Sequence, residues 1–330
     1  MAKRKNKVAK KQNNLLTYIA WSLATIALIL SCLIAGYYVG YNNAIEDIQI
    51  QNSTIEKKID KPRKTTTTLH RQLKEVLKKE TIEIKPKKTI IKTASHEYES
   101  LAKPPSRLVK KQHIITNKPK LAIIIDDVSI KSHINAIKNL NLKITMSFLP
   151  PSKARPNSAK LASKEKFYMV HLPMEAEHFT AEEPLTMRVH HSQQEITKRI
   201  KELKKLFPRV KYINNHTGSK FTSNEIAVHK LIVALNKYNI NFIDSRTTSK
   251  TKVPLVMKEF GKKYMARDIF LDNRNDKEYI KNQIKKAIQI AKREGYAIAI
   301  GHPHINTILA INESKKLFKD VELVYVNRLY

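Results

Sequence analysis

Short apolar segments alternate with amphipathic segments throughout residues 119–330, and this alternation limits the fold more than any other feature of the sequence. Leu121–Ile125 is continuously apolar, which is typical of a strand buried on both faces. Ser192 begins a capping-box pattern, and Asp276 and Gly295 stand where the start and the end of a long helix are expected. Strands that alternate with helices indicate a parallel sheet. We therefore predict an α/β fold, a distorted (β/α) TIM-like barrel of seven or eight strands.

The strands after the first one are predicted from their apolar residues and from the helix signals between them. No glycine-rich loop follows the first strand, which counts against a dinucleotide-binding sheet. In chain order, the further strands are expected at Ile144–Phe148, Phe167–Val170, Val210–Ile213, Asn241–Ile243, Lys263–Met265, Ala297–Ile300 and Glu322–Val326.

Reactive side chains stand at the ends of these predicted strands. Because the carboxyl ends of parallel barrel strands emerge on one face, residues far apart in the sequence converge there. Burying so many ionisable groups is costly unless they share charge, hydrogen bonds or a metal ion. We therefore predict one common functional site. In chain order, its candidate residues are Asp126 and Asp127, His171, Asn214, Asn215 and His216, Asp244, Arg267 and Asp268, and His302.

The residue types in this set are suited to metal-assisted hydrolysis. One carboxylate with two imidazoles is a common ligand set for zinc and similar divalent ions, and it leaves a position open for water, whose pKa the metal lowers toward ~7. A second carboxylate can then act as general base, and a histidine across the cleft can act as general acid. Cysteine ligands are excluded from residues 119–330, because the single cysteine of the chain is Cys32.

At these positions the chain resembles the divergent polysaccharide deacetylase family, a branch of the carbohydrate deacetylase superfamily. The resemblance implies a distorted barrel that removes N- or O-acetyl groups from a glycan by metal-activated water. It further implies that Asp126 is the general base, that Asp127 is a metal ligand, and that His302 is the general acid. The matching segments occur in the family's order at residues 122–127, 171–175, 214–219, 242–248, 266–272 and 298–303.

One segment departs from the superfamily pattern. Ordinary deacetylases take both metal imidazoles from a single His-x-x-x-His segment after the third strand, whereas Glu175 stands four residues after His171 here. The resemblance therefore implies His171 as one ligand and leaves two alternatives for the other, His216 or Glu175. The expected cofactor is a divalent metal, with zinc as the expected ion. The alternative function is a glycan- or cell-wall-binding envelope protein that keeps the fold without catalysis.

The remaining polar residues have two interpretations each. Asp244, Arg246, Arg267 and Asp268 are expected either to orient the metal ligands and catalytic groups or to hold the barrel rim by salt bridges. The two asparagines of the candidate set are expected either to bind sugar hydroxyls or to form the hydrogen bonds of a turn. Three histidines outside that set are expected at the surface. The asparagines are Asn214 and Asn215, and the histidines are His190, His191 and His304.

The first part of the sequence predicts a membrane anchor. Residues 15–41 carry no charge, and this run is longer than the roughly 20 apolar residues that are needed to span a bilayer. Aromatic residues stand at both of its ends. Residues 1–14 are rich in lysine, so we expect them to stay in the cytoplasm while the C-terminal domain reaches the periplasm or the outside. Residues 42–118 are rich in Lys, Thr and Glu, which predicts a mostly disordered linker, with an envelope protein as a partner it could bind.

The net charge of +33 limits the choice of partners. A strongly basic chain suits a polyanionic neighbour, such as nucleic acid, anionic lipid or an acidic glycan. No zinc finger, helix-turn-helix or aromatic RNA-binding signature accompanies the charge, so no specific nucleic-acid partner is expected. The expected substrate is a polysaccharide or a peptidoglycan-like glycan.

Overall fold

The structure is a computed structural model of the chain, and it describes Leu23, residues 118–179 and residues 181–329. The three predicted N-terminal segments therefore lie outside the described part of the chain, apart from Leu23, which is helical, and Lys118. Among the residues that are described, there is no helix with the length and apolarity needed to cross a bilayer.

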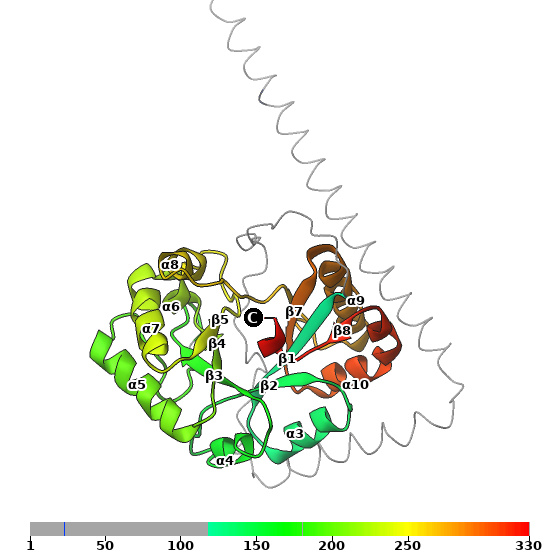
Figure 1. Ribbon diagram of the computed structural model, residues 1–330, viewed down its shortest axis with the longest axis horizontal. Helices are drawn as coiled ribbons and strands as arrows, with labels where there is room; N and C mark the ends of the chain where they lie inside the picture. Colours follow the sequence, from blue (N-terminus) through cyan, green and yellow to red (C-terminus); the bar gives the residue numbers. More distant parts are fainter. Residues whose placement is uncertain (1–22, 24–117, 180, 330) are drawn as a thin grey trace, which may run out of the picture. The chain divides into compact units, whose positions relative to one another are not determined.

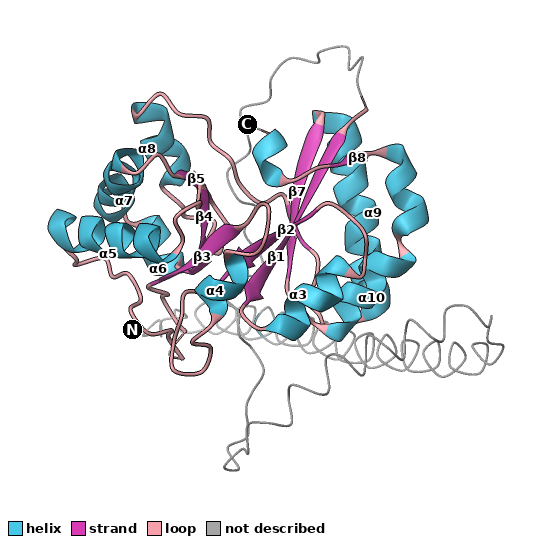
Figure 2. Ribbon diagram, turned by 60° about the horizontal axis from the view of Figure 1, so that its bottom comes forward, coloured by secondary structure: helices cyan, strands magenta, loops and turns pink. Residues whose placement is uncertain are grey.

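The centre of the fold is a curled, parallel half-barrel of seven strands, in the order β5-β4-β3-β2-β1-β7-β6. An eighth strand, β8, pairs with the first residues of β1. Figures 1 and 2 show this sheet with its helices outside the curl. The strands are β1 (Lys120–Val128), β2 (Ile144–Phe148), β3 (Met169–Met174), β4 (Tyr212–Thr217), β5 (Asn241–Ile243), β6 (Ile269–Phe270), β7 (Tyr296–Gly301) and β8 (Glu322–Leu323).

The two edges of the curled sheet are linked by main-chain hydrogen bonds. The backbone nitrogen of Asp244, just after β5, donates to the carbonyl oxygen of Met265 at 3.0 Å. The nitrogen of Asp268 donates to the carbonyl oxygen of Ile298 in β7 at 2.8 Å. The expected sixth strand at Lys263–Met265 is wrong: these residues form no strand, the next residue, Ala266, makes an isolated bridge with Asp244, and β6 begins at Ile269. The sheet is parallel as predicted, and its seven strands form a half-barrel in place of the complete barrel that was expected.

Helices cover the outer face, and the predicted helix signals are present. Ser192 caps α5 with both hydrogen bonds of a capping box. Asp276 caps α9, whose C-terminal Gly295 has a φ of 82°. The helices are α3 (Lys131–Lys138), α4 (Ser158–Ala162), α5 (Gln193–Leu206), α6 (Ser219–Ser223), α7 (Glu225–Lys237), α8 (Val253–Glu259), α9 (Lys277–Glu294) and α10 (Ile305–Glu313), with 3-10 turns at Lys315–Asp320 and Val326–Arg328.

Two apolar layers lie on opposite faces of the sheet. In β1, Ile123 and Ile125 pack in the layer between the sheet and the helices, whereas Ala122 and Ile124 pack in the layer inside the curl. The C-terminal segment also belongs to the inner layer, where Val326 is fully buried. Complete burial of an aliphatic side chain contributes about 1.5–3 kcal/mol, so both layers stabilise the curl.

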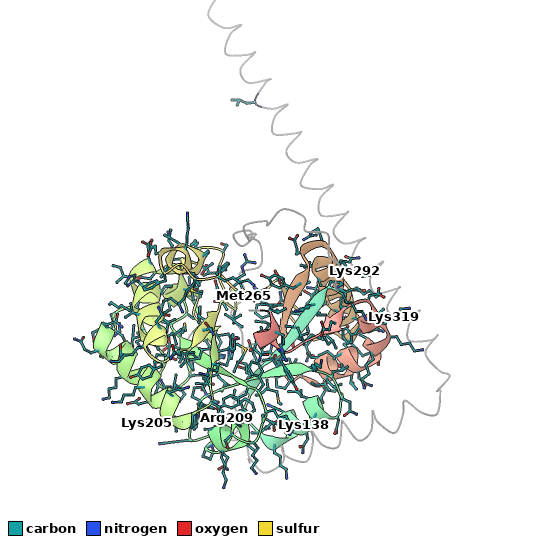
Figure 3. The ribbon with its side chains drawn as sticks, viewed as in Figure 1. Lys138, Lys205, Arg209, Met265, Lys292 and Lys319 are labelled. Atoms are coloured by element: carbon teal, nitrogen blue, oxygen red, sulfur yellow. The ribbon has the colours of Figure 1, made fainter. Side chains whose placement is uncertain are left out.

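The positive charge is spread over the outer surface. Lys138, Lys205, Lys292 and Lys319 are all exposed and lie on different elements around the fold (Figure 3).

Candidate active site

Strand alternation explains which side chains point inside the curl. Successive residues of a strand face opposite sides of a sheet. In β4, Tyr212 belongs to the inner apolar layer and Ile213 to the outer one, so Asn214 and His216 face inward. Asn215 faces outward by the same rule. Met169 in β3 and Ile300 in β7 also belong to the inner layer. His171 and His302 stand two residues after them, so both histidines face inward as well.

Asp126 and Asp127 share one inward position because β1 has a bulge at its end. The pairing of β1 with β2 shifts between Ile125 and Val128, and both of these residues lie in the outer layer. Regular alternation would turn Asp127 outward. Instead, its φ of 56° and the extra residue of the bulge place both aspartates on the inner face, between the outward-facing Ile125 and Val128. Both carboxylates therefore reach the same site.

Three potential metal ligands come together at this end of the barrel. Oδ1 of Asp127 lies 3.1 Å from Nδ1 of His216 and 3.5 Å from Nε2 of His171. Two ligands of a tetrahedral zinc ion, each bonded at about 2.0–2.1 Å, are separated by roughly 3.3 Å. The observed separations therefore fit the ligand spacing of such an ion. All three ligand atoms lie within 4.8 Å of one another.

The protonation states of Asp127 and His171 also suit a cation. Burial opposes the charge of Asp127, but the imidazoles of His216 and His171 outweigh it and hold the pKa of Asp127 well below its usual range. Burial also lowers the pKa of His171 well below the ordinary histidine value. An ionised carboxylate and a neutral imidazole are the forms that bind metal ions.

Asp126 lies beside the three ligands but in a different electrostatic environment. Its Oδ2 is 3.6 Å from Nε2 of His171, and its side chain is almost completely buried. Burial raises the pKa of Asp126 to about 7, although the positive charge of His302 and the hydrogen bonds from Asn214 oppose the shift. A carboxylate with a pKa near neutrality is well suited to accept and return a proton.

Directly after β7, His302 pairs with Asp272. Nδ1 of His302 lies 3.0 Å from Oδ1 of Asp272, and both side chains are buried. Burial opposes the charge of each group, but their attraction prevails: it raises the pKa of His302 to about 9 and lowers the pKa of Asp272 to about 2. His302 is therefore protonated at neutral pH.

Sequence reasoning did not single out Asp272 as a site residue. The only available signal was its place at the end of the matching segment 266–272, two residues after β6. His304, expected at the surface, is instead half-buried, with its ring 5.8 Å from the ring of His302. Asp272, His302 and His304 are also close enough to hold a cation. Both oxygens of Asp272 already accept hydrogen bonds, from His302 and Thr307. The group of Asp127, His171 and His216 is therefore the better candidate for a metal site.

Glu175, the alternative metal ligand, lies in neither of the two clusters that could hold a cation among the described residues. Its Oε1 accepts a hydrogen bond from Nζ of Lys220 at 2.8 Å, and its Oε2 accepts one from the backbone nitrogen of Val189 at 2.8 Å. These contacts lower the pKa of Glu175 even though partial burial opposes them. The carboxylate of Glu175 thus holds the loop before α5 against α6.

The aspartates and arginines at the rim hold main-chain segments in place. Asp244 is fully buried and accepts hydrogen bonds from the backbone nitrogen of Arg246 and from Tyr264. Arg267 donates to the carbonyl oxygens of Ser245 and Arg246 at 2.6 and 2.7 Å. Asp268 accepts from the backbone nitrogen of Ile298 in β7, at 2.7 Å. These residues fix the loop after β5 and the link between the sheet edges.

Asn215 has the same supporting role. Its Oδ1 accepts a hydrogen bond from the backbone nitrogen of Ser245 at 2.8 Å, and its Nδ2 donates to the carbonyl oxygen of Thr217 at 2.6 Å. Asn215 therefore connects β4 to the loop after β5 from the outer side of the sheet. The inward neighbour Asn214 contacts both Asp126 and His171.

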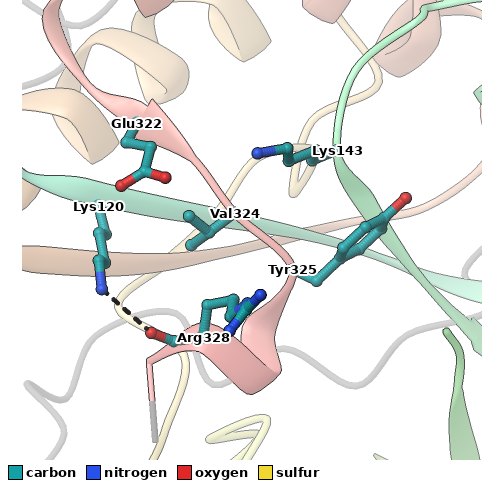
Figure 4. A pocket seen from close by; sticks show the side chains of 6 residues that line it. All are labelled: Lys120, Lys143, Glu322, Val324, Tyr325 and Arg328. Atoms are coloured by element: carbon teal, nitrogen blue, oxygen red, sulfur yellow. Dashed lines mark hydrogen bonds between the residues drawn. The ribbon is translucent and has the colours of Figure 1, made fainter.

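A separate pocket of about 430 Å³ opens at the opposite end of the barrel, where β1 begins (Figure 4). None of the candidate catalytic or metal-binding residues lines it, so it is not the candidate active site. Its lining residues are Lys120, Lys143, Glu322, Val324, Tyr325 and Arg328.

Comparison with known proteins decides the family. The sequence pattern of the divergent polysaccharide deacetylases matches residues 123–330, which include every residue of the site described above. The chain belongs to this family. As a divergent polysaccharide deacetylase, it carries the inward-facing Asp126–Asp127 pair and His302 in the segments that suggested the resemblance.

Relatives of this divergent polysaccharide deacetylase occur in several bacteria. The uncharacterized protein YibQ of Escherichia coli is 35% identical over 213 residues, which are 64% of this chain and 67% of YibQ. An uncharacterized protein of Haemophilus influenzae is 32% identical over 216 residues, which are 64% of this chain and 76% of that protein. The crystal structure of the uncharacterized protein ATU2773 from Agrobacterium tumefaciens has a similar fold, with a TM-score of 0.57 and 18% identity, over 65% of this chain and 90% of that one.

Proposed function

We propose that this chain is a metal-dependent hydrolase that removes N- or O-acetyl groups from a polysaccharide or a peptidoglycan-like glycan. The observation that carries the proposal is the arrangement of Asp127, His171 and His216 around one point, with Asp126 beside them and His302 directly after β7, paired with Asp272. The family supports the same reaction class.

The three ligands fit a divalent cation, with zinc as the ion best suited to their chemistry. Two imidazoles and one carboxylate are a common zinc set, and their separations match tetrahedral ligand spacing. A zinc ion held by these side chains would supply Lewis acidity and would lower the pKa of a water molecule toward about 7.

The protein's own residues then move the protons of hydrolysis. Asp126 takes a proton from the attacking water, which a carboxylate with a pKa of about 7 can do at neutral pH. His302, kept protonated by Asp272, donates a proton to the nitrogen or oxygen that leaves the acetyl group. The C–N or C–O bond breaks, a C–O bond to the water oxygen forms, and the products are acetate and the deacetylated sugar. Because both proton-transfer groups are present, catalysis is favoured over glycan binding alone.

We further propose that the domain works outside the cytoplasm. The support is the uncharged run of residues 15–41, preceded by the lysine-rich residues 1–14, which would anchor the chain with its N-terminus in the cytoplasm. The linker of residues 42–118 would then let the domain reach a cell-envelope glycan and could also bind an envelope protein. Protease treatment of spheroplasts tests this orientation: digestion of the C-terminal domain supports it, and protection contradicts it.

The enzymatic proposal is tested with the full-length chain purified in detergent. Bound metal is measured by mass spectrometry, and acetate release is measured on acetylated glycan. We expect stoichiometric divalent metal that is lost in Asp127→Ala and His171→Ala, and an Asp126→Ala variant that binds metal but releases no acetate. His190→Ala, which removes an exposed histidine, serves as the control and should change neither. Glycan binding without acetate release by the wild-type chain would establish the non-catalytic alternative instead.

A further inference from the structure

The side-chain amide of Asn214 lies between the proposed base and one proposed metal ligand. Its Nδ2 is 3.0 and 2.9 Å from the two carboxylate oxygens of Asp126. Its Oδ1 is 3.1 Å from Nδ1 of His171 and 2.6 Å from the hydroxyl of Ser147. Asn214 is completely buried, so these contacts are made in the absence of competing bulk water.

The chemistry of Asp126 determines which way this amide is turned. One atom of the Asn214 amide faces both carboxylate oxygens of Asp126, and a carboxyl group keeps at least one oxygen that can only accept a hydrogen bond, whether or not it carries a proton. The amide atom that faces Asp126 must therefore be the NH₂ group of Asn214, and the amide oxygen must face the other way. The hydroxyl of Ser147, which can donate, satisfies part of that oxygen.

The orientation of the amide in turn determines the tautomer of His171. Because the oxygen of Asn214 accepts hydrogen bonds, the nitrogen of His171 that faces it has to carry a proton. A neutral imidazole has only one such proton, so Nε2 is left with a free lone pair. Nε2 is the atom that lies 3.5 Å from Oδ1 of Asp127. The nitrogen that is free to bind a cation is thus the one that faces the other proposed ligands.

We propose that Asn214 is a positioning residue that fixes the metal-binding tautomer of His171 and at the same time holds the carboxylate of Asp126 in place. This inference rests on the proposed function, because it assigns His171 to the metal and Asp126 to the base. One amide thereby places both groups at defined positions relative to each other. Leucine and alanine offer neither the donor nor the acceptor, and aspartate offers no donor for Asp126 when it is ionised.

The amide is itself held by neighbouring elements. Nδ2 of Asn214 also lies 3.0 Å from the hydroxyl of Ser245, in the loop after β5. The backbone nitrogen of Ser245 is held by Asn215 from the outer side of the sheet. Asn215 is the adjacent and equally buried asparagine, and its own hydrogen bonds reach neither Asp126 nor His171, so Asn215→Ala separates a loss of support for the loop after β5 from the direct effect of Asn214.

The tautomer is tested directly on the full-length chain in detergent, labelled with ¹⁵N-histidine and stripped of metal. Two-bond ¹H–¹⁵N correlation distinguishes the two tautomers, and the signal of His171 is identified by its loss in His171→Ala. We expect the proton on Nδ1 in the wild-type chain and in Asn215→Ala, and loss of this preference in Asn214→Ala. A proton on Nε2 of His171 in the wild-type chain would overturn the inference, and this measurement does not depend on the folding of any variant at position 214.

Zinc affinity, measured by competition with a chelating dye, gives the second readout. We expect Asn214→Ala to weaken zinc binding by about 10–100-fold, the usual effect of losing a group that orients a metal ligand. Asn215→Ala should bind zinc as the wild-type chain does, even if its thermal unfolding temperature falls by as much as that of Asn214→Ala. Equal zinc affinity of folded Asn214→Ala and wild-type chains would contradict the inference. If the wild-type chain binds no zinc, the proposed function fails, while the tautomer of His171 still decides the role of Asn214.

Discussion

The carboxylate of Asp272 contacts His302 at two points: Oδ1 lies 3.0 Å from the ring Nδ1, and Oδ2 accepts a hydrogen bond from the backbone nitrogen at 2.6 Å. The hydroxyl of Thr307 donates to the same Oδ2 at 2.7 Å. These contacts hold a charged imidazole inside the protein, against the cost of burial. His302 can therefore serve as a proton donor over a wide pH range.

Replacing Asp272 should narrow that range. In the wild-type chain we expect acetate release to fall as the pH rises through about 9, because His302 then loses its proton. In Asp272→Asn the attraction to the carboxylate is gone, so the pKa of His302 falls and the basic limb of the pH–rate profile moves to lower pH. The measurement is the pH dependence of kcat/KM between pH 6 and 10.

Asp276→Asn provides the control for that comparison, because Asp276 caps α9 through the backbone nitrogen of Tyr279 and asparagine can replace it in this role. Its pH–rate profile should match that of the wild-type chain. A basic limb at the same pH in Asp272→Asn and in the wild-type chain would mean that Asp272 does not control His302.

The same pair predicts a pH dependence of stability. The pKa of His302 is raised from 6.5 to about 9 in the folded protein, so the stabilisation it provides is fully present below about pH 6.5 and is lost as the pH rises through about 9. Since one pKa unit corresponds to about 1.4 kcal/mol, the loss amounts to a few kcal/mol. Urea unfolding at pH 6 and pH 9.5 should show a smaller difference for His302→Gln than for the wild-type chain. Equal differences would contradict this assignment.

Substitution can distinguish His216 from Glu175 as the metal ligand that accompanies Asp127 and His171. His216→Ala should lose tightly bound zinc, because Nδ1 of His216 lies 3.1 Å from Oδ1 of Asp127. Glu175→Gln should keep it, because the carboxylate of Glu175 is engaged by Lys220 and by the backbone of Val189. Zinc at 100 times its dissociation constant stabilises a folded chain by about 2.7 kcal/mol, so thermal unfolding with and without zinc measures both effects. Zinc loss in Glu175→Gln alone would reverse the assignment.

Gly218, directly after β4, should tolerate no side chain. Its φ is 92°, and an added Cβ would lie 2.9 Å from Cβ of Met174 on the neighbouring strand. We expect Gly218→Ala to destabilise the protein by about 2–4 kcal/mol, combining backbone strain with a displaced strand. Gly261→Ala is the matched control, because Gly261 also has a positive φ of 62° but an added Cβ would have no neighbour within 4 Å. It should cost only about 1 kcal/mol. Chemical denaturation of both variants measures the difference, and equal losses would exclude the close approach as the cause.

Much of the fold could be predicted from the sequence because it depends on local patterns. Continuous apolar runs such as Leu121–Ile125 indicate buried strands, and the caps Ser192 and Asp276 bind the backbone of their helices as expected. Strand ends could also be predicted to converge, since this follows from the parallel arrangement alone.

The details that could not be predicted depend on contacts between distant segments. β6 has only two residues and is defined by its pairing with Ala299 and Ile300, so its own composition carries almost no signal. Asp272 becomes a partner of His302 only through the register of β7 against the segment around β6. The inward turn of Asp127 requires a bulge, and nothing in an Asp-Asp dipeptide specifies a φ of 56°.

The proposed ligands of the cation come from three separate strands, β1, β3 and β4, rather than from one short segment. No part of the unfolded chain brings them near one another, so binding the cation and folding the barrel would be coupled events. Sites of this kind follow a common affinity order among divalent ions, so metal availability helps to select which ion is bound. The ion that a chain retains would thus depend on the compartment in which that chain completes its folding.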